Sequence, residues 1–225
     1  MNRFFLILLF FSIHVVGLHA DNPRSDFSGI NLRLGVRILS LQSLNDALQN
    51  EGLAEVNPIA FSYNLGFTRF NEKFVTNLNF ISFRAYGQKN QNKSNFQGLG
   101  ISFDLGYQIF GNEKMSLYPY VNLSFIQNRF QTHQQSNASN FSAIYAQQLV
   151  ERTFIRGSEF GSALGLSYQI KIAKNHLLRV GGGYHFRFWQ PFDWYHQLEN
   201  KVNFPKVDNS GWEVGITWVR KRLNK

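Results

Sequence analysis

The chain has 225 residues, of which 44% are hydrophobic and only 16% are charged, and its formal net charge is +9. Soluble domains usually carry about 25% charged residues, so this composition argues against an ordinary water-exposed surface. The chain contains no cysteine, which excludes disulfide bonds and thiolate metal sites. Its length is sufficient for one domain or two small ones.

The N-terminus has the pattern of a secretory signal peptide. Arg3 supplies a positive start, an apolar stretch runs from Phe4 to Leu18, and Ala20 is a small residue at the expected cleavage site. The alternative is a membrane-anchoring helix, but the stretch is shorter than the roughly 20 residues that a span needs, and polar residues interrupt it. We therefore predict cleavage after Ala20, with 1–20 as signal peptide and 21–225 as a single β-barrel domain.

The mature chain alternates apolar residues with small or polar ones. The pattern is clearest from Leu99 to Ile109, where every second residue is apolar and Gly, Ser, Asp or Gln stands between. Period-two alternation indicates a β-strand with two different faces. Eight segments show it: Ile30–Ile38, Ile59–Phe67, Phe74–Phe80, Leu99–Ile109, Tyr120–Phe125, Ala163–Ile170, Leu178–Phe188 and Trp212–Trp218. The pattern slips at Ile81 and Ser82, which predicts a β-bulge there.

The predicted connections alternate between short and long. The short ones are Asn71–Lys73, Gly111–Lys114 and Ala173–His176, and the long ones are Ser40–Pro58, Gln88–Asn95, Gln131–Thr153 and Pro191–Ser210. An even number of strands with short turns at one rim and long loops at the other is typical of transmembrane β-barrels. We predict an all-β fold, an eight-stranded antiparallel up-and-down transmembrane β-barrel with short periplasmic turns and long external loops.

The first long loop contains a predicted short helix, Ser43 to Gly52. Leu44, Ala47 and Leu48 would share one face, Ser43 could cap the N-terminus, and Gly52 could end the helix. Two interpretations stay open at this point. The helix either lies over the barrel mouth or binds a partner, or it is a packed decoration of the loop.

The two strand faces predict two environments. The regular apolar face suits lipid, and the small polar face suits a narrow, packed lumen, because an eight-stranded barrel has just enough interior room for side chains. Ionisable residues on the inner face predict a structural charge network: Arg33, Arg37, Asp104, Arg179, Arg187 and Glu213. Within it we expect Glu213 to bridge Arg37 and Arg187 at the loop end of the barrel.

With this layout the segment Gly29–Arg222 resembles the small eight-stranded outer-membrane β-barrel proteins of Gram-negative bacteria, the OmpA-, OmpX- and OmpW-like group of the porin superfamily, particularly its Bacteroidota type. The resemblance implies an integral protein of the cell outer membrane. It implies outer-membrane lipids, lipopolysaccharide and the barrel-assembly machinery as partners, and a monomeric state. Such barrels often end in an aromatic residue that the assembly machinery reads, and the last aromatic residue here is Trp218.

The function predicted from these features is a structural or surface-interaction role that the external loops carry. One alternative is a small-solute channel of OmpW type. Another is a lipid A deacylase-like hydrolase that would use His133 and Ser136, although two residues separate this pair within a polar loop. We predict no cofactor, no metal and no nucleic-acid partner, and we expect the basic segment Arg220–Arg222 to lie beside anionic headgroups.

Overall fold

The computed structural model describes residues 27–71, 73–90, 92–112, 114–134, 153–196 and 207–222, so the predicted signal peptide lies outside the described residues. The strands are β1 (Phe27–Ile38), β2 (Ile59–Asn71), β3 (Phe74–Lys89), β4 (Asn92–Tyr107), β5 (Phe110–Gly111), β6 (Met115–Gln134), β7 (Thr153–Ala173), β8 (His176–His196) and β9 (Gly211–Lys221), and the helix is α2 (Gln42–Asn50).

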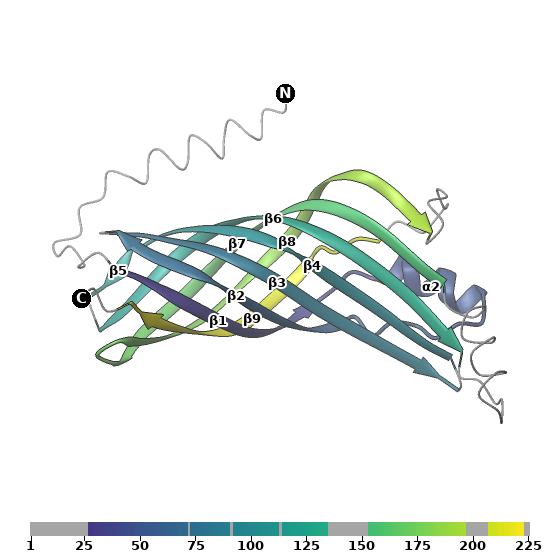
Figure 1. The fold of residues 1–225 in the computed structure, drawn as a ribbon, viewed down its shortest axis with the longest axis horizontal. Coiled ribbons are helices and arrows are strands. Elements are labelled where there is room, and N and C mark those ends of the chain that lie inside the picture. Colours follow the sequence, from purple (N-terminus) through teal and green to yellow (C-terminus); the bar gives the residue numbers. More distant parts are fainter. Residues whose placement is uncertain are drawn as a thin grey trace.

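Eight of the strands form a closed antiparallel barrel (Figure 1). Consecutive long strands pair with each other, β4 pairs with β6, and β9 returns to pair with β1, which closes the ring. The two-residue strand β5 pairs with β6 and adds no wall of its own. Each of the eight long strands is thereby paired on both sides, as a barrel in lipid requires, and at the loop-bearing end β8 continues past His185, where its pairing with β9 stops. The predicted eight-stranded antiparallel barrel is therefore confirmed.

The two ends of the barrel differ. The Asn71–Lys73, Gly111–Lys114 and Lys174–Asn175 connections lie at one end, where β1 begins and β9 ends, and α2 lies at the other (Figure 1). We call these the turn end and the loop end. At the loop end the strands extend further than the sequence pattern indicates, because β7 begins at Thr153 and β8 continues to His196.

Two local predictions were wrong. The segment Gln88–Asn95 is not a loop, since β3 runs to Lys89, β4 starts at Asn92, and the turn between them uses Asn90 with a left-handed φ of 54°. Asparagine tolerates this conformation in a tight hairpin turn. There is also no bulge at Ile81 and Ser82, where pairing to β2 and β4 continues in unbroken register.

The register is irregular in the β7–β8 pair instead, between Arg156 and Gly161 and again between Lys171 and Ala173. The slip that the sequence shows at Ile81 has another cause. The inner face of β3 changes there from asparagine to the apolar series Ile81, Phe83 and Ala85.

The predicted loop helix exists as α2, although its first cap differs from the prediction. The N-cap position is Leu41 and no side chain caps the helix, so the Ser43 cap is wrong. Gly52 ends the helix as predicted, with φ at +69°. Its N–H bonds Gln49 O at 3.0 Å and the Leu53 N–H bonds Leu48 O at 2.8 Å, which is the Schellman arrangement.

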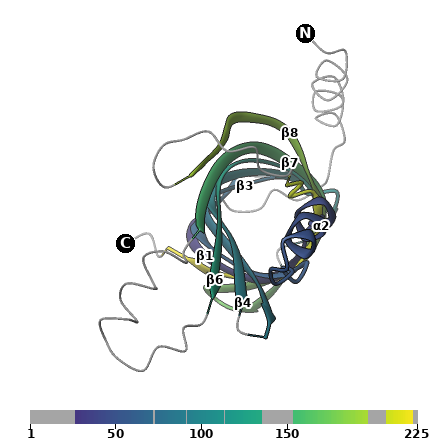
Figure 2. The ribbon, with the colours of Figure 1, turned by 90° about the vertical axis from the view of Figure 1, so that its right-hand side faces the viewer.

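The apolar face of α2 points into the barrel. Leu44 and Leu48 are 1% and 4% exposed, and Figure 2 shows α2 at the mouth of the ring of strands. These leucines belong to an apolar cluster, which we call the loop-end plug: Leu39, Leu41, Leu44, Leu48, Val56, Ala60, Phe83, Ala85, Phe96, Ile126, Phe130 and Val207. The Asn45 amide fixes the returning loop, because it donates to Val56 O at 2.9 Å and accepts from Val56 N at 2.8 Å. The helix therefore lies at one side of the mouth of the barrel and contributes Leu44 and Leu48 to the plug.

A second apolar cluster, the turn-end plug, lies at the opposite end of the interior. It consists of Phe70, Val75, Tyr118, Leu177 and Val219, each at most 1% exposed. The interior thus has apolar material at both ends. Buried polar side chains, among them Asn77, Asp104 and Glu213, lie between the two plugs.

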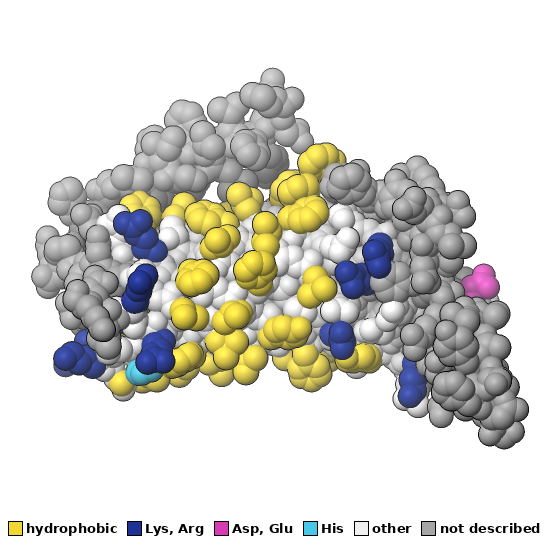
Figure 3. All heavy atoms as spheres, viewed as in Figure 1, with side chains coloured by type: hydrophobic (Ala, Val, Ile, Leu, Met, Phe, Trp, Pro, Cys, Tyr) yellow, Lys and Arg dark blue, Asp and Glu magenta, His cyan; other side chains and the backbone are white. Residues whose placement is uncertain are grey.

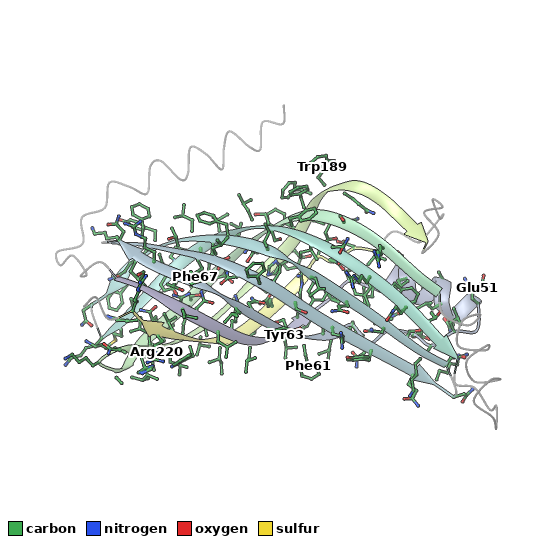
Figure 4. All side chains as sticks on the ribbon, viewed as in Figure 1. Glu51, Phe61, Tyr63, Phe67, Trp189 and Arg220 are labelled. Carbon is green, nitrogen blue, oxygen red and sulfur yellow. The ribbon has the colours of Figure 1, made fainter. Side chains whose placement is uncertain are left out.

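The outer wall is the reverse of a soluble protein's surface. Large apolar side chains point outward on every long strand, among them Phe61 at 70%, Phe67 at 64% and Leu34 at 61% exposed. On the face that Figure 3 shows, they form a belt across the middle of the barrel, with Lys and Arg side chains toward both ends. Figure 4 shows Phe61, Tyr63 and Trp189 projecting away from the ribbon. The predicted faces are confirmed, since Leu105 is 42% exposed and Ser102 is buried.

Candidate functional site

The polar middle of the lumen is the candidate site, because the described ionisable side chains of the interior gather there. Four arginines and three carboxylates face inward: Arg33, Arg37, Arg179, Arg187, Asp104, Glu159 and Glu213. Two small cavities of about 20 Å³ each lie among them. A volume of this size holds roughly one water molecule. Side chains therefore fill this part of the lumen almost completely.

Glu213 of β9 is the centre of an ion cluster. One carboxylate oxygen lies 3.1 Å from Nη2 of Arg33, and the other lies 3.0 Å from Nε2 of His185. The carboxylate is 7% exposed. A charge that is taken out of water needs a partner with good geometry, so the neighbouring strands on both sides of β9 each supply one. The cluster joins β1, β9 and β8 across the closing seam of the barrel.

The predicted partners of Glu213 were wrong. Arg37 is the register partner of Glu213 on β1, but its Nη2 donates to Asn209 O at 2.8 Å and its guanidinium lies 4.8 Å from the Phe83 ring centroid. Arg187 donates to Val207 O and to Gln190 Oε1. Both arginines extend toward the loop between β8 and β9, where backbone carbonyls are available. They tie that loop to the barrel wall.

Asp104 of β4 is the second centre of the lumen. Its Oδ2 accepts from the amides of Asn77 and Asn79 at 3.1 Å each, and its Oδ1 accepts from Asn122. Three neutral donors on β3 and β6 thus surround this carboxylate from both neighbouring strands. The hydrogen bonds replace the water that a buried carboxylate loses.

Arg179 of β8 lies toward the turn end. It donates to Asn77 Oδ1 at 3.2 Å and to Gln169 Oε1 at 3.3 Å, and its guanidinium lies 5.1 Å from the Tyr118 ring centroid. Arg179 therefore connects the network around Asp104 to the turn-end plug. Cation–π contact suits a guanidinium at such a boundary between polar and apolar groups.

Several members of the network were not among the predicted site residues. His185 and Glu159 are 9% and 3% exposed, and Asn77 and Asn79 are both 6% exposed. Each of them has a signal in the sequence, because each occupies the inward parity of its strand. What the alternation does not reveal is which of them meet across the lumen. The neighbour of Tyr120 is another contact that the alternation does not reveal. The Tyr120 ring lies against Gly165, where an added Cβ would stand 2.3 Å from a ring atom.

The side chains of the hydrolase alternative lie outside the described residues. The His133 backbone belongs to the end of β6, but its side chain and all of Ser136 lie outside the described residues. The described residues contain no group of three His, Asp or Glu side chains that could hold a metal ion. No helix among them is long and apolar enough to span a membrane.

Together, the fold and its outer wall define a membrane-spanning β-barrel. The apolar belt faces outward and the ionisable side chains of that region face inward, an arrangement that is stable with lipid outside. In water the same belt would expose an apolar area far larger than soluble monomers tolerate.

Comparison with known proteins supports the fold. No family model and no curated protein matches this sequence. A major outer membrane protein from Thermus thermophilus is similar in structure, with TM-score 0.56, 9% identity and coverage of 88% of this chain and 100% of that one. The Neisserial surface protein A has a TM-score of 0.49 and 12% identity, and the match covers 89% of this chain and 100% of that one. OprG from Pseudomonas aeruginosa has a TM-score of 0.48 and 16% identity, and the match covers 90% of this chain and 98% of that one. At these identities the likeness concerns the fold, and the last two TM-scores are too low to support more.

Proposed function

We propose that the protein is an integral outer-membrane β-barrel without a channel, and that its role is structural or a surface interaction carried by the external loops. The proposal includes export with signal-peptide cleavage near Ala20 and residence among outer-membrane lipids and lipopolysaccharide. It also includes insertion by the barrel-assembly machinery, a monomeric state and no enzymatic activity.

The closed lumen is the observation that carries this proposal. Apolar plugs stand at both ends, and between them two cavities of about 20 Å³ each lie among the described residues of the ion cluster and the Asp104 network. An eight-stranded barrel has just enough interior room for side chains to fill it, whereas porins that enclose a wide aqueous channel have about 16–18 strands. With the lumen filled, the surfaces available for a partner are the loop end and the outer wall.

Conductance distinguishes this proposal from the small-solute channel. The full-length protein reconstituted in a planar bilayer is expected to show no unitary current, and vesicles containing it are expected to resist swelling in small sugars. An open porin in the same bilayers is the positive control. Reproducible current steps, or sugar uptake above that of empty vesicles, would contradict the closed lumen and favour the channel.

The membrane topology is a separate prediction, and the absence of cysteine makes it easy to measure. Asn50→Cys places a thiol on exposed α2 at the loop end, and Lys174→Cys places one in an exposed connection at the turn end. A membrane-impermeant maleimide should label the first variant in intact cells and the second only after lysis. Labelling of Lys174→Cys in intact cells would reverse the orientation.

A further inference from the structure

A groove on the outer wall at the turn end has no role in the closed barrel described so far. It has a volume of about 640 Å³ and is formed by β1, β2, β3, β4 and β9, together with Asn175 and His176 at the start of β8. Unlike the lumen cavities it lies on the side of the barrel that faces lipid. Figure 4 shows its two labelled residues, with Arg220 at the turn end and Phe67 nearer to the middle of the barrel.

The floor of the groove is a continuous apolar row across four strands. Ile30 pairs with Phe67, Phe67 with Leu78, and Leu78 with Phe103, and these side chains are 45–64% exposed. On its other side, Ile30 pairs with Arg220 of β9. Neighbouring strands are about 4.8 Å apart, so the row from Arg220 to Phe103 spans about 19 Å. That length suits one extended acyl chain.

The outer end of the groove is basic. Arg69, Arg220 and Arg222 line it, and Arg69 and Arg222 meet at Ser28, which pairs with Arg69 and accepts the Arg222 N–H at 2.7 Å. Among the described residues, no hydrogen bond or ion pair engages the three guanidiniums, and no Asp or Glu lines the groove. Guanidinium groups bind phosphate oxygens in bidentate fashion.

We infer that this groove binds one anionic phospholipid of the membrane leaflet at the turn end. The three guanidiniums hold the phosphate, and one acyl chain lies along Ile30, Phe67, Leu78 and Phe103. The groove and a phospholipid have the same order of polar and apolar parts. The basic end of the groove lies at the rim, where the headgroup would be, and its apolar floor leads into the belt, where the acyl chain would be. His176 stacks on Trp218 beside Arg220, at ring centroids 5.4 Å apart, which places an amphipathic aromatic pair at headgroup level.

This inference rests on the proposed membrane location, and the experiment separates the two. The full-length protein is first inserted into phosphatidylcholine vesicles, and insertion is checked by flotation and by heat-dependent gel mobility. It is then extracted in mild detergent, incubated with equimolar phosphatidylglycerol and phosphatidylcholine of identical chains, and examined by native mass spectrometry. We expect one retained phosphatidylglycerol per barrel and about tenfold preference over phosphatidylcholine.

Three variants test the site. The triple variant R69Q/R220Q/R222Q should lose the preference, and Thr76→Trp, which fills the groove without changing charge, should lose the retained lipid. The control variant R84Q/K89Q/K93Q removes three exposed basic residues at the loop end and should keep both properties.

The outcomes separate as follows. Failure to insert would contradict the membrane location. Insertion with equal retention of both lipids, or with preference unchanged in R69Q/R220Q/R222Q, would overturn the lipid site alone. If inorganic phosphate competes for the site as strongly as phosphatidylglycerol does, the groove is an anion site and not a lipid site. A second copy of the chain retained in place of lipid would also overturn the inference.

Discussion

Glu213→Gln should give a folded but much less stable barrel. The substitution keeps the shape of the side chain and removes its charge, so Arg33 and His185 lose the carboxylate that lies 3.1 Å and 3.0 Å away. Removing one partner of a buried ion pair costs about 3–5 kcal/mol, because the remaining charge stays out of water. Urea unfolding in lipid vesicles, followed by tryptophan fluorescence, should show a lower midpoint with an unchanged slope.

Glu51→Gln is the matched control for this experiment. Glu51 is exposed at the end of α2, so its neutralisation should leave the midpoint unchanged. A double variant, Arg33→Met with Glu213→Leu, should recover part of the lost stability, since it removes both charges together. If Glu213→Gln unfolds at the same urea concentration as the parent, the ion cluster has no structural role.

Leu34→Arg should hinder membrane insertion more than the same change near the rim. Leu34 is the middle one of five outward apolar residues on β1 and is 61% exposed, with Tyr63 and Ile216 as its neighbours. Arginine on the lipid face costs about 2–4 kcal/mol at the midplane of the membrane and about 0–1 kcal/mol near the interface.

Leu105→Arg provides the comparison of depth. Leu105 also faces outward, but it lies two residues before the end of β4 at the turn end. We expect its cost to be clearly smaller than that of Leu34→Arg in reversible unfolding from lipid vesicles. Equal costs at the two positions, or no cost at Leu34, would contradict the assignment of the apolar belt to the membrane core.

The sequence was sufficient for the features that depend on neighbouring residues. Alternation at period two is a local property of an extended chain, so it assigned Leu105 to the outer face and Ser102 to the inner face correctly. The same pattern, counted along the chain, predicted eight strands and the order of the turns at one end. The end of α2 at Gly52 was equally local, because that position requires a positive φ.

The strand pattern failed where distant parts of the chain meet. Ile81 and Phe83 break the polar series of the inner face, and the sequence alone interpreted that break as a bulge. The structure explains it as part of the loop-end plug, the apolar cluster that also contains Leu44 and Leu48 of α2. An apolar residue on an inward face reflects what lies opposite to it in the lumen, and strand periodicity carries no information about that.

What the sequence determined by itself was therefore the fold, the two faces and six of the ionisable residues of the interior, without Glu159 and His185. Only the tertiary structure decided that Glu213 meets Arg33 and His185 while Arg37 meets Asn209, and that Arg69, Arg220 and Arg222 gather at one groove. The physical reason is closure. Pairing β9 with β1 sets the stagger of every strand, and this stagger, together with side-chain length, determines which inward and outward groups become neighbours.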